Sequence, residues 1–265
     1  MKPEKIEQTI TRLGSSIKMA VSPKGKEQHL EYNVLKSSRN SAVLKISVGR
    51  TTAVGKLFSD TKPARKMFRR ERRALDVLNG AQIPKLKLVA EKDLFVLSEF
   101  IEGRPLTDVL SENSLPRTAE HVGQWLGNLE SAAPHKDSDD NWYGYLKNYE
   151  KGLNFEALDK QRALLKNSPV GRLTLAHNDN AMSNYILGTD KRLYGIDFES
   201  AQMKPVGWDL ITATLAMMRK FPNAISDIIN AKMRGYNLTA PNSVLPKDFE
   251  QIISVVSVSH LVSDV

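Results

Sequence analysis

The chain has 265 residues, of which 41% are hydrophobic, so it is long enough to bury a sizeable core. Its 38 basic and 30 acidic residues give a net charge of +8, and it has no cysteine, which excludes disulfides, thiolate metal sites and cysteine nucleophiles. Because neither a signal peptide nor an apolar run long enough to span a bilayer is recognisable, we expect a soluble, cytoplasmic protein.

The first third of the chain predicts an antiparallel sheet with two helices. Four apolar residues recur at helical spacing near the N-terminus and predict an amphipathic helix: Ile6, Ile10, Leu13 and Ile17. Short apolar runs separated by turn-forming residues predict strands at about 30–35, 42–48, 52–58, 87–90 and 95–100. A second helix is expected from about Lys62 to Leu78, before the turn Asn79-Gly80.

The character of the sequence changes at the segment Glu102-Gly103-Arg104-Pro105. Helical periodicity dominates beyond it, around 122–129 and again at 158–165, and a short β segment at 173–197 interrupts it before helices resume at Asp209. We therefore expect an α+β protein with a β-rich front third and a mainly helical remainder.

Much of the positive charge lies in one run, KPARKMFRRERR, from Lys62 to Arg73. The run has two interpretations: the solvated face of a helix, or a surface that binds nucleic acid or an anionic membrane. No helix-turn-helix pattern and no aromatic-interleaved basic motif accompanies it, so charge alone does not establish nucleic-acid binding.

A cluster of polar residues follows the predicted strand at 173–176. His177, Asp179 and Asn184 come directly after this strand, and Asp197 and Glu199 come after the second strand of a predicted hairpin. The hairpin would bring Asn184 beside Asp197, and such amide and carboxylate oxygens are the ligands that Mg²⁺ prefers.

Phosphoryl transfer needs this set of groups, because metal ligands neutralise phosphate oxygens and a separate carboxylate orients the attacking hydroxyl. We predict Asp179 as the general base or aligner, Asn184 and Asp197 as metal ligands, and Glu199 as a ligand of a second metal or of a metal-bound water. Each residue taken alone would more often be a structural histidine, a turn residue or a helix cap. Only their joint spacing favours a catalytic and metal-binding role.

The same residues resemble a family pattern. His-x-Asp-x-x-x-x-Asn at 177–184, followed by Ile-Asp-Phe-Glu at 196–199, resembles the catalytic loop and metal motif of aminoglycoside phosphotransferases and choline kinases. The form of the motifs is closer to the choline/ethanolamine kinase branch, and the interval of 13 residues from Asn184 to Asp197 matches the kinase-like hairpin. The resemblance implies a bilobal protein-kinase-like fold, with a nucleotide-binding N-lobe at 1–101 and a C-lobe at 102–265.

The resemblance also implies structural roles for two residues. His177 would support the catalytic loop, and Asp209, in the segment Gly207-Trp208-Asp209-Leu210, would begin the following helix and hold the same loop.

Two charged residues of the front third are expected to meet. Lys56 shares one face of its strand with Val54 and Phe58, and Glu71 lies within the apolar stripe of the Lys62–Leu78 helix. Because a buried carboxylate is costly without a cation, we predict that Lys56 and Glu71 pair. Protein kinases use such a pair to hold the α- and β-phosphates of ATP.

The resemblance places the adenine-binding hinge at Ser98, Glu99, Phe100 and Ile101. The turn that would cover the phosphates, at 37–41, has no glycine, which leaves a pseudokinase or nucleotide-binding scaffold as an alternative.

We therefore predict an ATP- and Mg²⁺-dependent phosphotransferase that acts on a hydroxyl of a small molecule: an amino alcohol, a sugar or an aminoglycoside-like compound. Only 12 positions separate Asp197 from Asp209, too few for the segment on which protein kinases place a peptide. Specific nucleic-acid binding and membrane insertion are not expected, although a basic nucleic-acid or membrane-surface binder stays open as a further alternative.

Overall fold

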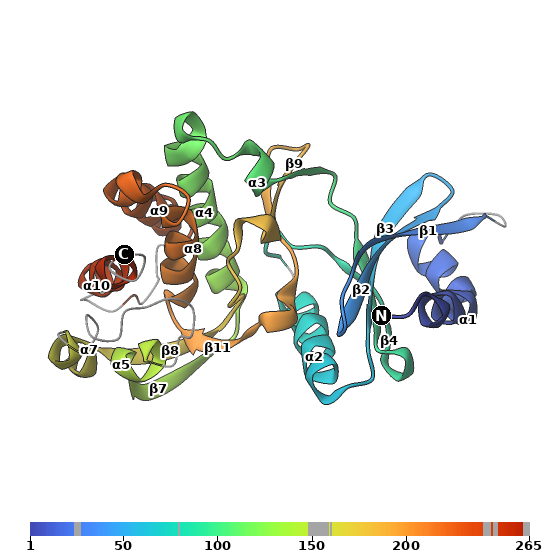
Figure 1. Cartoon of the computed structure of the whole chain (residues 1–265), viewed down its shortest axis with the longest axis horizontal. Helices are drawn as coiled ribbons and strands as arrows, with labels where there is room; N and C mark the ends of the chain where they lie inside the picture. The colour runs from blue at the N-terminus through green and yellow to red at the C-terminus, as the bar shows by residue number, and fades with distance from the viewer. Residues whose placement is uncertain are drawn as a thin grey trace. The chain divides into compact units, whose positions relative to one another are not determined.

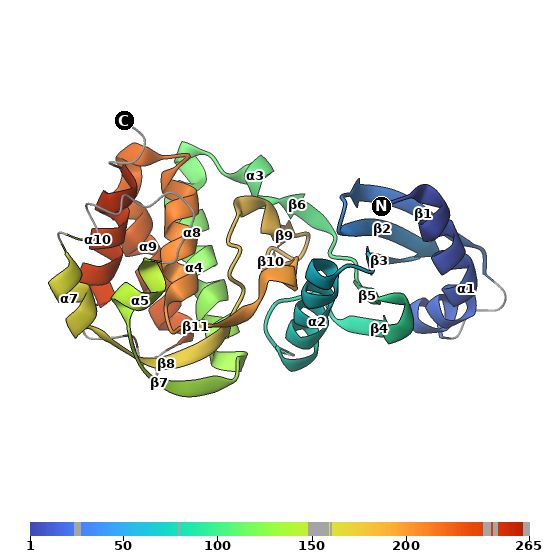
Figure 2. The ribbon, with the colours of Figure 1, turned by 60° about the horizontal axis from the view of Figure 1, so that its bottom comes forward.

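The structure is a computed structural model that describes residues 1–23, 28–78, 80–147, 159, 161–240, 245 and 249–261. It contains two compact units, each drawn in Figures 1 and 2. The first unit combines Met1–Asn79, Ile83–Glu102 and Ile196–Ser200, and the second combines Gly80–Gln82, Gly103–Gly195 and Ala201–Val265. No helix in the described part is both long and apolar enough to cross a membrane.

The first unit is built on an antiparallel sheet with the strand order β1-β2-β3-β5-β4. Its strands are β1 (Leu30–Ser37), β2 (Ser41–Val48), β3 (Thr51–Phe58), β4 (Leu86–Ala90) and β5 (Phe95–Glu99). Two 3₁₀ turns also belong to this unit, at Glu91–Asp93 and at Phe198–Ser200. All the strands expected in the front third are present, within a residue or two of the predicted bounds.

Helix α1 (Pro3–Val21) packs against one face of this sheet, and its predicted apolar stripe is buried there. Ile10 and Ile17 join a core cluster with Leu44 and Leu57 of the sheet. Because residues alternate along β3, Leu57 faces this core while its neighbours Lys56 and Phe58 face the other way.

Helix α2 (Lys62–Val77) packs against the opposite face, as Figure 2 shows. It is capped by Thr61, whose hydroxyl accepts a hydrogen bond from the Ala64 N–H. The rings of Phe58 on β3 and Phe68 on α2 meet edge to face, with centroids 5.8 Å apart. This contact fixes which face of α2 looks at the sheet.

The second unit is mainly helical. Its helices are α3 (Leu106–Val109), α4 (Leu115–Ala132), α5 (Trp142–Leu146), α7 (Arg162–Asn167), α8 (Trp208–Met218), α9 (Ile225–Thr239) and α10 (Phe249–Leu261). Short 3₁₀ turns lie at Glu112–Ser114, Met182–Asn184 and Pro222–Ala224. Helices α4 and α9 cross closely, because a Cβ atom at Gly123 would collide with the carbonyl oxygen of Lys232. Part of the helix expected at 158–165 lies outside the described residues.

Two three-stranded sheets accompany these helices, with the orders β10-β9-β6 and β11-β8-β7. Their strands are β6 (Gly103–Pro105), β7 (His135–Asn141), β8 (Pro169–Ala176), β9 (Tyr185–Gly188), β10 (Leu193–Gly195) and β11 (Gln202–Pro205). The sequence analysis did not predict β6, β7 or β11. β7 reads HKDSDDN and is mostly exposed, so it has no apolar alternation and is a strand only because it pairs with β8.

Candidate functional site

A charged cluster in the first unit surrounds Lys56, which is only 6% exposed. Its Nζ lies 2.5 Å from Asp197 Oδ1, 2.8 Å from Glu199 Oε2 and 3.5 Å from Glu71 Oε2. The contact between Lys56 and Glu71 that the sequence predicted is therefore present. Asp197 and Glu199 join it, which the sequence analysis did not foresee.

Backbone geometry explains how these residues reach one another. The 3₁₀ turn Phe198–Ser200 packs against α2, the helix that carries Glu71. Asp197 adopts the left-handed region with a φ of 67°, an uncommon conformation that aspartate tolerates better than most residues. The cluster thus combines a strand, a helix and a tight turn from three separate parts of the chain.

The cluster holds three carboxylates around one ammonium group. Burial alone would lower the pKa of Lys56, but the charges of Glu71, Asp197 and Glu199 outweigh it and hold this pKa above its ordinary value. Burial raises the pKa of Glu71 to about 7, against the lowering effect of Lys56. Lys56 therefore stays charged at neutral pH, and burial makes Glu71 hold its proton more readily than an exposed glutamate.

In the second unit, the loop after β8 is tied to the start of α8 by one carboxylate. Asp209 Oδ2 accepts a hydrogen bond from the His177 N–H at 2.7 Å, and Oδ1 accepts one from the Asn178 N–H at 3.0 Å. Oδ1 also accepts a hydrogen bond from Asn180 Nδ2 at 2.7 Å. Asp209 thus fixes the loop at His177, Asn178 and Asn180.

The chain can place Asp209 there because Gly207 has a φ of 86° just before the helix, a conformation that favours glycine. Strand β11 precedes this turn and pairs with β8, with Gln202 opposite Ala176. The last residue of β11, Pro205, lies opposite Leu173, and the turn at Gly207 then directs the start of α8 back to His177.

Asp179 and Asn184 are joined within this loop. Asn184 Nδ2 donates a hydrogen bond to the Asp179 carbonyl oxygen at 2.9 Å. Because the amide nitrogen is used in this way, the amide oxygen is the atom suited to bind a cation. The Asp179 N–H in turn donates to His177 Nδ1 at 3.3 Å, so the Asp179 backbone is held on both sides.

His177 is a buried, structural residue. It is 1% exposed, and its ring meets Trp125 of α4 edge to face, with centroids 6.1 Å apart. A histidine so enclosed contributes packing and hydrogen bonding to the loop.

Five residues that shape the loop were not predicted from the sequence: Asn178, Asn180, Tyr185, Trp208 and Thr212. Asn178 has a φ of 62°, and its Oδ1 accepts a hydrogen bond from Trp208 Nε1 at 3.0 Å. Asn180 also donates to Thr212 Oγ1 at 2.8 Å and accepts from the Tyr185 hydroxyl. Burial raises the pKa of that hydroxyl well above its ordinary value, so it stays a donor. The only signal in the sequence was their closeness to the motifs.

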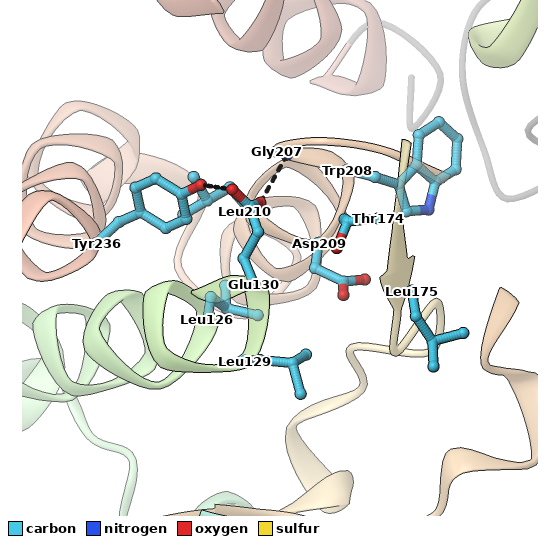
Figure 3. Close-up of a pocket in the computed structure, with 10 residues that line it drawn as sticks. All are labelled: Leu126, Leu129, Glu130, Thr174, Leu175, Gly207, Trp208, Asp209, Leu210 and Tyr236. Atoms are coloured by element: carbon cyan, nitrogen blue, oxygen red, sulfur yellow. Dashed lines mark hydrogen bonds between the residues drawn. The ribbon is translucent and has the colours of Figure 1, made fainter. Parts of the chain in front are cut away.

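Figure 3 shows a small cavity beside Asp209, with a volume of about 10 Å³. It is lined mainly by apolar side chains of α4, β8 and α8. Glu130 also borders it and accepts hydrogen bonds from the Tyr236 hydroxyl and, at 3.2 Å, from the Gly207 N–H. The cavity is large enough for a single water, so it belongs to the support of α8 and cannot hold a substrate.

The predicted hinge residues lie at the end of the first sheet. Ser98 and Glu99 end β5, and the Glu99 N–H already donates to the Lys85 carbonyl at 2.9 Å. Phe100 and Ile101 follow outside the strand ladder, and Lys45 Nζ lies 4.9 Å from the centre of the Phe100 ring. Phe100 and Ile101 are thus better suited than Glu99 to offer backbone groups to a ligand.

The glycine-free turn at 37–41 is organised by a serine. Ser38 Oγ accepts hydrogen bonds from the Asn40 N–H at 3.1 Å and from the Ser41 N–H at 3.0 Å. Such a turn is closed by side-chain hydrogen bonds and so does not depend on the conformational freedom of glycine.

The structure thus assembles the predicted site residues in two groups. Lys56, Glu71, Asp197 and Glu199 meet in the first unit, and His177, Asp179, Asn184 and Asp209 form one loop in the second. The meeting of Asn184 with Asp197 stays a prediction.

The oxygen donors present suit Mg²⁺, a hard cation. The described residues contain no ready-made group of three or more His, Cys, Asp or Glu ligands. A Mg²⁺ ion would therefore need an amide oxygen or the phosphate oxygens of a nucleotide besides the carboxylates.

Comparison with known proteins adds independent information. The model of the phosphotransferase enzyme family matches residues 31–241. No curated protein matches this chain significantly.

Among solved structures, the choline kinase of Cryptosporidium parvum Iowa II is 15% identical, with a TM-score of 0.59 over 96% of this chain and 86% of that one. The macrolide 2′-phosphotransferase of Brachybacterium faecium is 10% identical, with a TM-score of 0.60 over 93% of this chain and 88% of that one. A thermostable aminoglycoside phosphotransferase in complex with ADP and hygromycin B is 16% identical, with a TM-score of 0.53 over 97% and 96% of the two chains. These likenesses establish the kinase-like α+β fold.

Proposed function

Because the chain belongs to the phosphotransferase enzyme family, we propose that it transfers the γ-phosphate of ATP, with Mg²⁺, to a hydroxyl group of a small molecule. The observation that carries this proposal is the cluster around Lys56. A buried ammonium group with Glu71 on one side and Asp197 and Glu199 on the other is suited to bind a nucleoside triphosphate and its metal.

In this proposal the first unit binds the nucleotide. Lys56, oriented by Glu71, contacts the phosphates, and Ser98, Glu99, Phe100 and Ile101 border the adenine. We assign residues 1–101 to a nucleotide-binding lobe and 102–265 to a lobe that carries the catalytic loop and the acceptor site.

Asn184, Asp197 and Glu199 would hold the metal. Mg²⁺ would supply positive charge to the phosphate oxygens during transfer. Asp179 would accept or orient the proton of the acceptor hydroxyl, and its backbone, held by His177 and Asn184, keeps it in place for that task.

The short path from Asp197 to Asp209 favours a small acceptor. The Phe198–Ser200 turn, strand β11 and Gly207 use eight of the eleven residues between them. Little chain is left on which an extended peptide could lie, so we infer an amino alcohol, a sugar or an aminoglycoside-like acceptor.

A coupled assay of ATP consumption over these three compound classes tests the proposal. We expect ATP turnover that depends on both Mg²⁺ and one acceptor class. Binding of MgATP with no turnover on any acceptor, and labelling of protein alone when cell extract is incubated with labelled ATP, would support a pseudokinase or a protein kinase instead.

Asp179→Asn is the matched variant for the transfer step. We expect it to lower kcat about 10²–10⁴-fold, because a positioned proton acceptor is lost while the side chain keeps its size. Calorimetry should show unchanged MgATP affinity, since Asp179 is assigned to the acceptor and not to the nucleotide. Near-full turnover of a confirmed acceptor by this variant would remove Asp179 from its proposed role.

A further inference from the structure

Four basic residues form a line along the exposed face of α2. Lys62, Lys66, Arg69 and Arg73 are all exposed and follow one another at intervals of four, three and four residues. This spacing places successive side chains on the same side of a helix. At about 1.5 Å of rise per residue, the line is about 16 Å long. We call these four residues the basic stripe.

Within the described part of the chain, no residue of the basic stripe forms an ion pair. The cations beside the stripe differ in this respect: Arg65 Nε lies 2.5 Å from Asp60 Oδ1, and Arg72 Nη1 lies 2.5 Å from Glu91 Oε1. Asp60 and Glu91 thus neutralise the flanking arginines, and the exposed carboxylate of α2 itself, Asp76, follows the stripe three residues after Arg73. From Lys62 to Arg73 the exposed face carries no acidic side chain.

The arrangement of charge is unfavourable for the helix itself. No acidic residue lies in the first turn of α2 and no basic residue lies in its last turn, so the helix dipole is not compensated at either end. Cations four residues apart, as in the pairs Lys62–Lys66 and Arg69–Arg73, also repel each other. A face that only needed to be solvated could mix both signs and avoid both effects, so this departure indicates a function.

We propose that the basic stripe binds the sugar–phosphate backbone of a nucleic-acid strand, independently of its sequence. A line of separate cations on a rigid helix matches a linear polymer with one phosphate per nucleotide. Arginine and lysine supply charge-assisted hydrogen bonds to phosphate oxygens. The exposed face of α2 has neither aromatic side chains for stacking nor asparagine or glutamine for base edges, so bases are not read.

A membrane surface fits this face less well. Helices that lie on membranes bury large apolar side chains beside their cations. The exposed large hydrophobic residues of the described chain include only Val77 on α2, at its C-terminal end. The other face of α2 is buried and carries Glu71, so the helix cannot turn to offer an apolar side.

The test measures binding to a labelled, mixed-sequence single-stranded DNA by fluorescence anisotropy, at salt concentrations between about 50 and 200 mM. Four phosphate contacts predict that log K falls against log salt with a slope of about −2.8. The whole chain is used, and sequence changes in the probe should leave the affinity unchanged.

Two matched double variants separate the stripe from net charge. Lys66→Gln with Arg69→Gln removes two stripe cations, and Arg65→Gln with Arg72→Gln removes two paired cations from the same helix. We expect the slope of log K against log salt to fall from about −2.8 to about −1.4 in the stripe variant. In the control variant it should stay close to the wild-type value. Thermal melts check that both variants fold.

Equal losses in the two variants would overturn the proposal, because net charge would then explain binding. Tighter binding to vesicles of anionic phosphatidylserine, or equal competition by poly-glutamate at the same charge concentration, would assign the stripe to a membrane or to an acidic protein. No binding at low salt would leave the stripe as a solvated face. None of these outcomes depends on whether the chain is a phosphotransferase.

Discussion

At the scale of single residues, two members of the candidate site have positive φ angles although neither is glycine: Asn178 and Asp197. Such conformations cost on the order of 1 kcal/mol and persist where surrounding contacts hold them. For Asn178 these contacts include the hydrogen bond that its N–H donates to Asp209 and the one that its side chain accepts from Trp208 Nε1. We infer that Trp208 positions the loop that carries Asp179.

Replacing the indole tests this inference. Trp208→Phe removes the hydrogen bond, so we expect kcat to fall by up to about tenfold, the worth of one such bond. Glycine adopts a positive φ without supporting contacts, so the double variant that also carries Asn178→Gly should regain much of the lost kcat. The measurement is kcat in the coupled assay.

The affinity for MgATP serves as the control, because Trp208 is not assigned to the nucleotide. If Trp208→Phe lowers kcat equally in the wild-type chain and in a chain that already carries Asn178→Gly, Trp208 acts only through packing.

A second residue, Lys232 on α9, is fully buried and its Nζ has no hydrogen-bond partner within the described part of the chain. Burial lowers its pKa well below the ordinary 10.5. Between the two pKa values the unfolded chain binds a proton that the folded chain does not, so stability rises with pH across this window.

Lys232→Met should therefore stabilise the protein. We expect about 1–3 kcal/mol at pH 7, because an unsatisfied buried amine is replaced by an apolar group of similar length. The gain should shrink as the pH approaches 10. Denaturant unfolding at both pH values measures it, and Lys87→Met on the exposed side of β4 is the control, with a change within about 0.5 kcal/mol. A variant that destabilises the protein at pH 7 would show that the amine has a favourable partner.

At the scale of elements, β3 and α2 carry the contact that the sequence predicted best, the one between Lys56 and Glu71. Period-two alternation placed Lys56 on one face of its strand, and a 3.6-residue stripe placed Glu71 on the buried side of its helix. Both patterns are local, so they could be recognised without the structure.

A double-mutant cycle with Lys56→Met and Glu71→Gln measures the coupling of these elements. Because the two groups are buried and 3.5 Å apart, we expect an interaction energy of about 1 kcal/mol or more in MgATP binding by calorimetry. Strictly additive losses would mean that Asp197 and Glu199 orient Lys56 without Glu71.

Other elements could not be predicted from local patterns. β7 is polar and mostly exposed, and β6 and β11 have only three and four residues, so none has a periodicity long enough to recognise. They are strands because other strands offer them hydrogen-bond partners, and β11 in turn positions Gly207 and Asp209.

At the scale of the whole molecule, each of the two units buries a core of its own. Ile17 of α1 is fully buried in the core of the first unit. All three tryptophans, Trp125, Trp142 and Trp208, lie in the second unit. Tryptophan fluorescence therefore reports on the second unit alone, whereas far-UV circular dichroism reports on both.

Ile17→Ala should destabilise the first unit by about 2–5 kcal/mol, because it leaves a cavity under α1. We expect an earlier transition by circular dichroism and an unchanged midpoint by tryptophan fluorescence. The control, Leu126→Ala in α4, should shift the fluorescence midpoint instead. Equal shifts of both signals by Ile17→Ala would mean that the units unfold as one.

Short-range order in the sequence was enough to determine the fold class and the family of this protein, and to propose its site residues. Motif spacing at 177–184 and 196–199, strand alternation and helical stripes all depend on neighbours along the chain, so they are visible without coordinates. Only the tertiary structure decided that Lys56 meets three carboxylates, that Asp209 holds the loop after β8 through three hydrogen bonds, and that Lys232 is enclosed with no hydrogen-bond partner among the described residues. Those features depend on residues dozens of positions apart, whose approach is set by packing and by strand pairing and not by any local pattern.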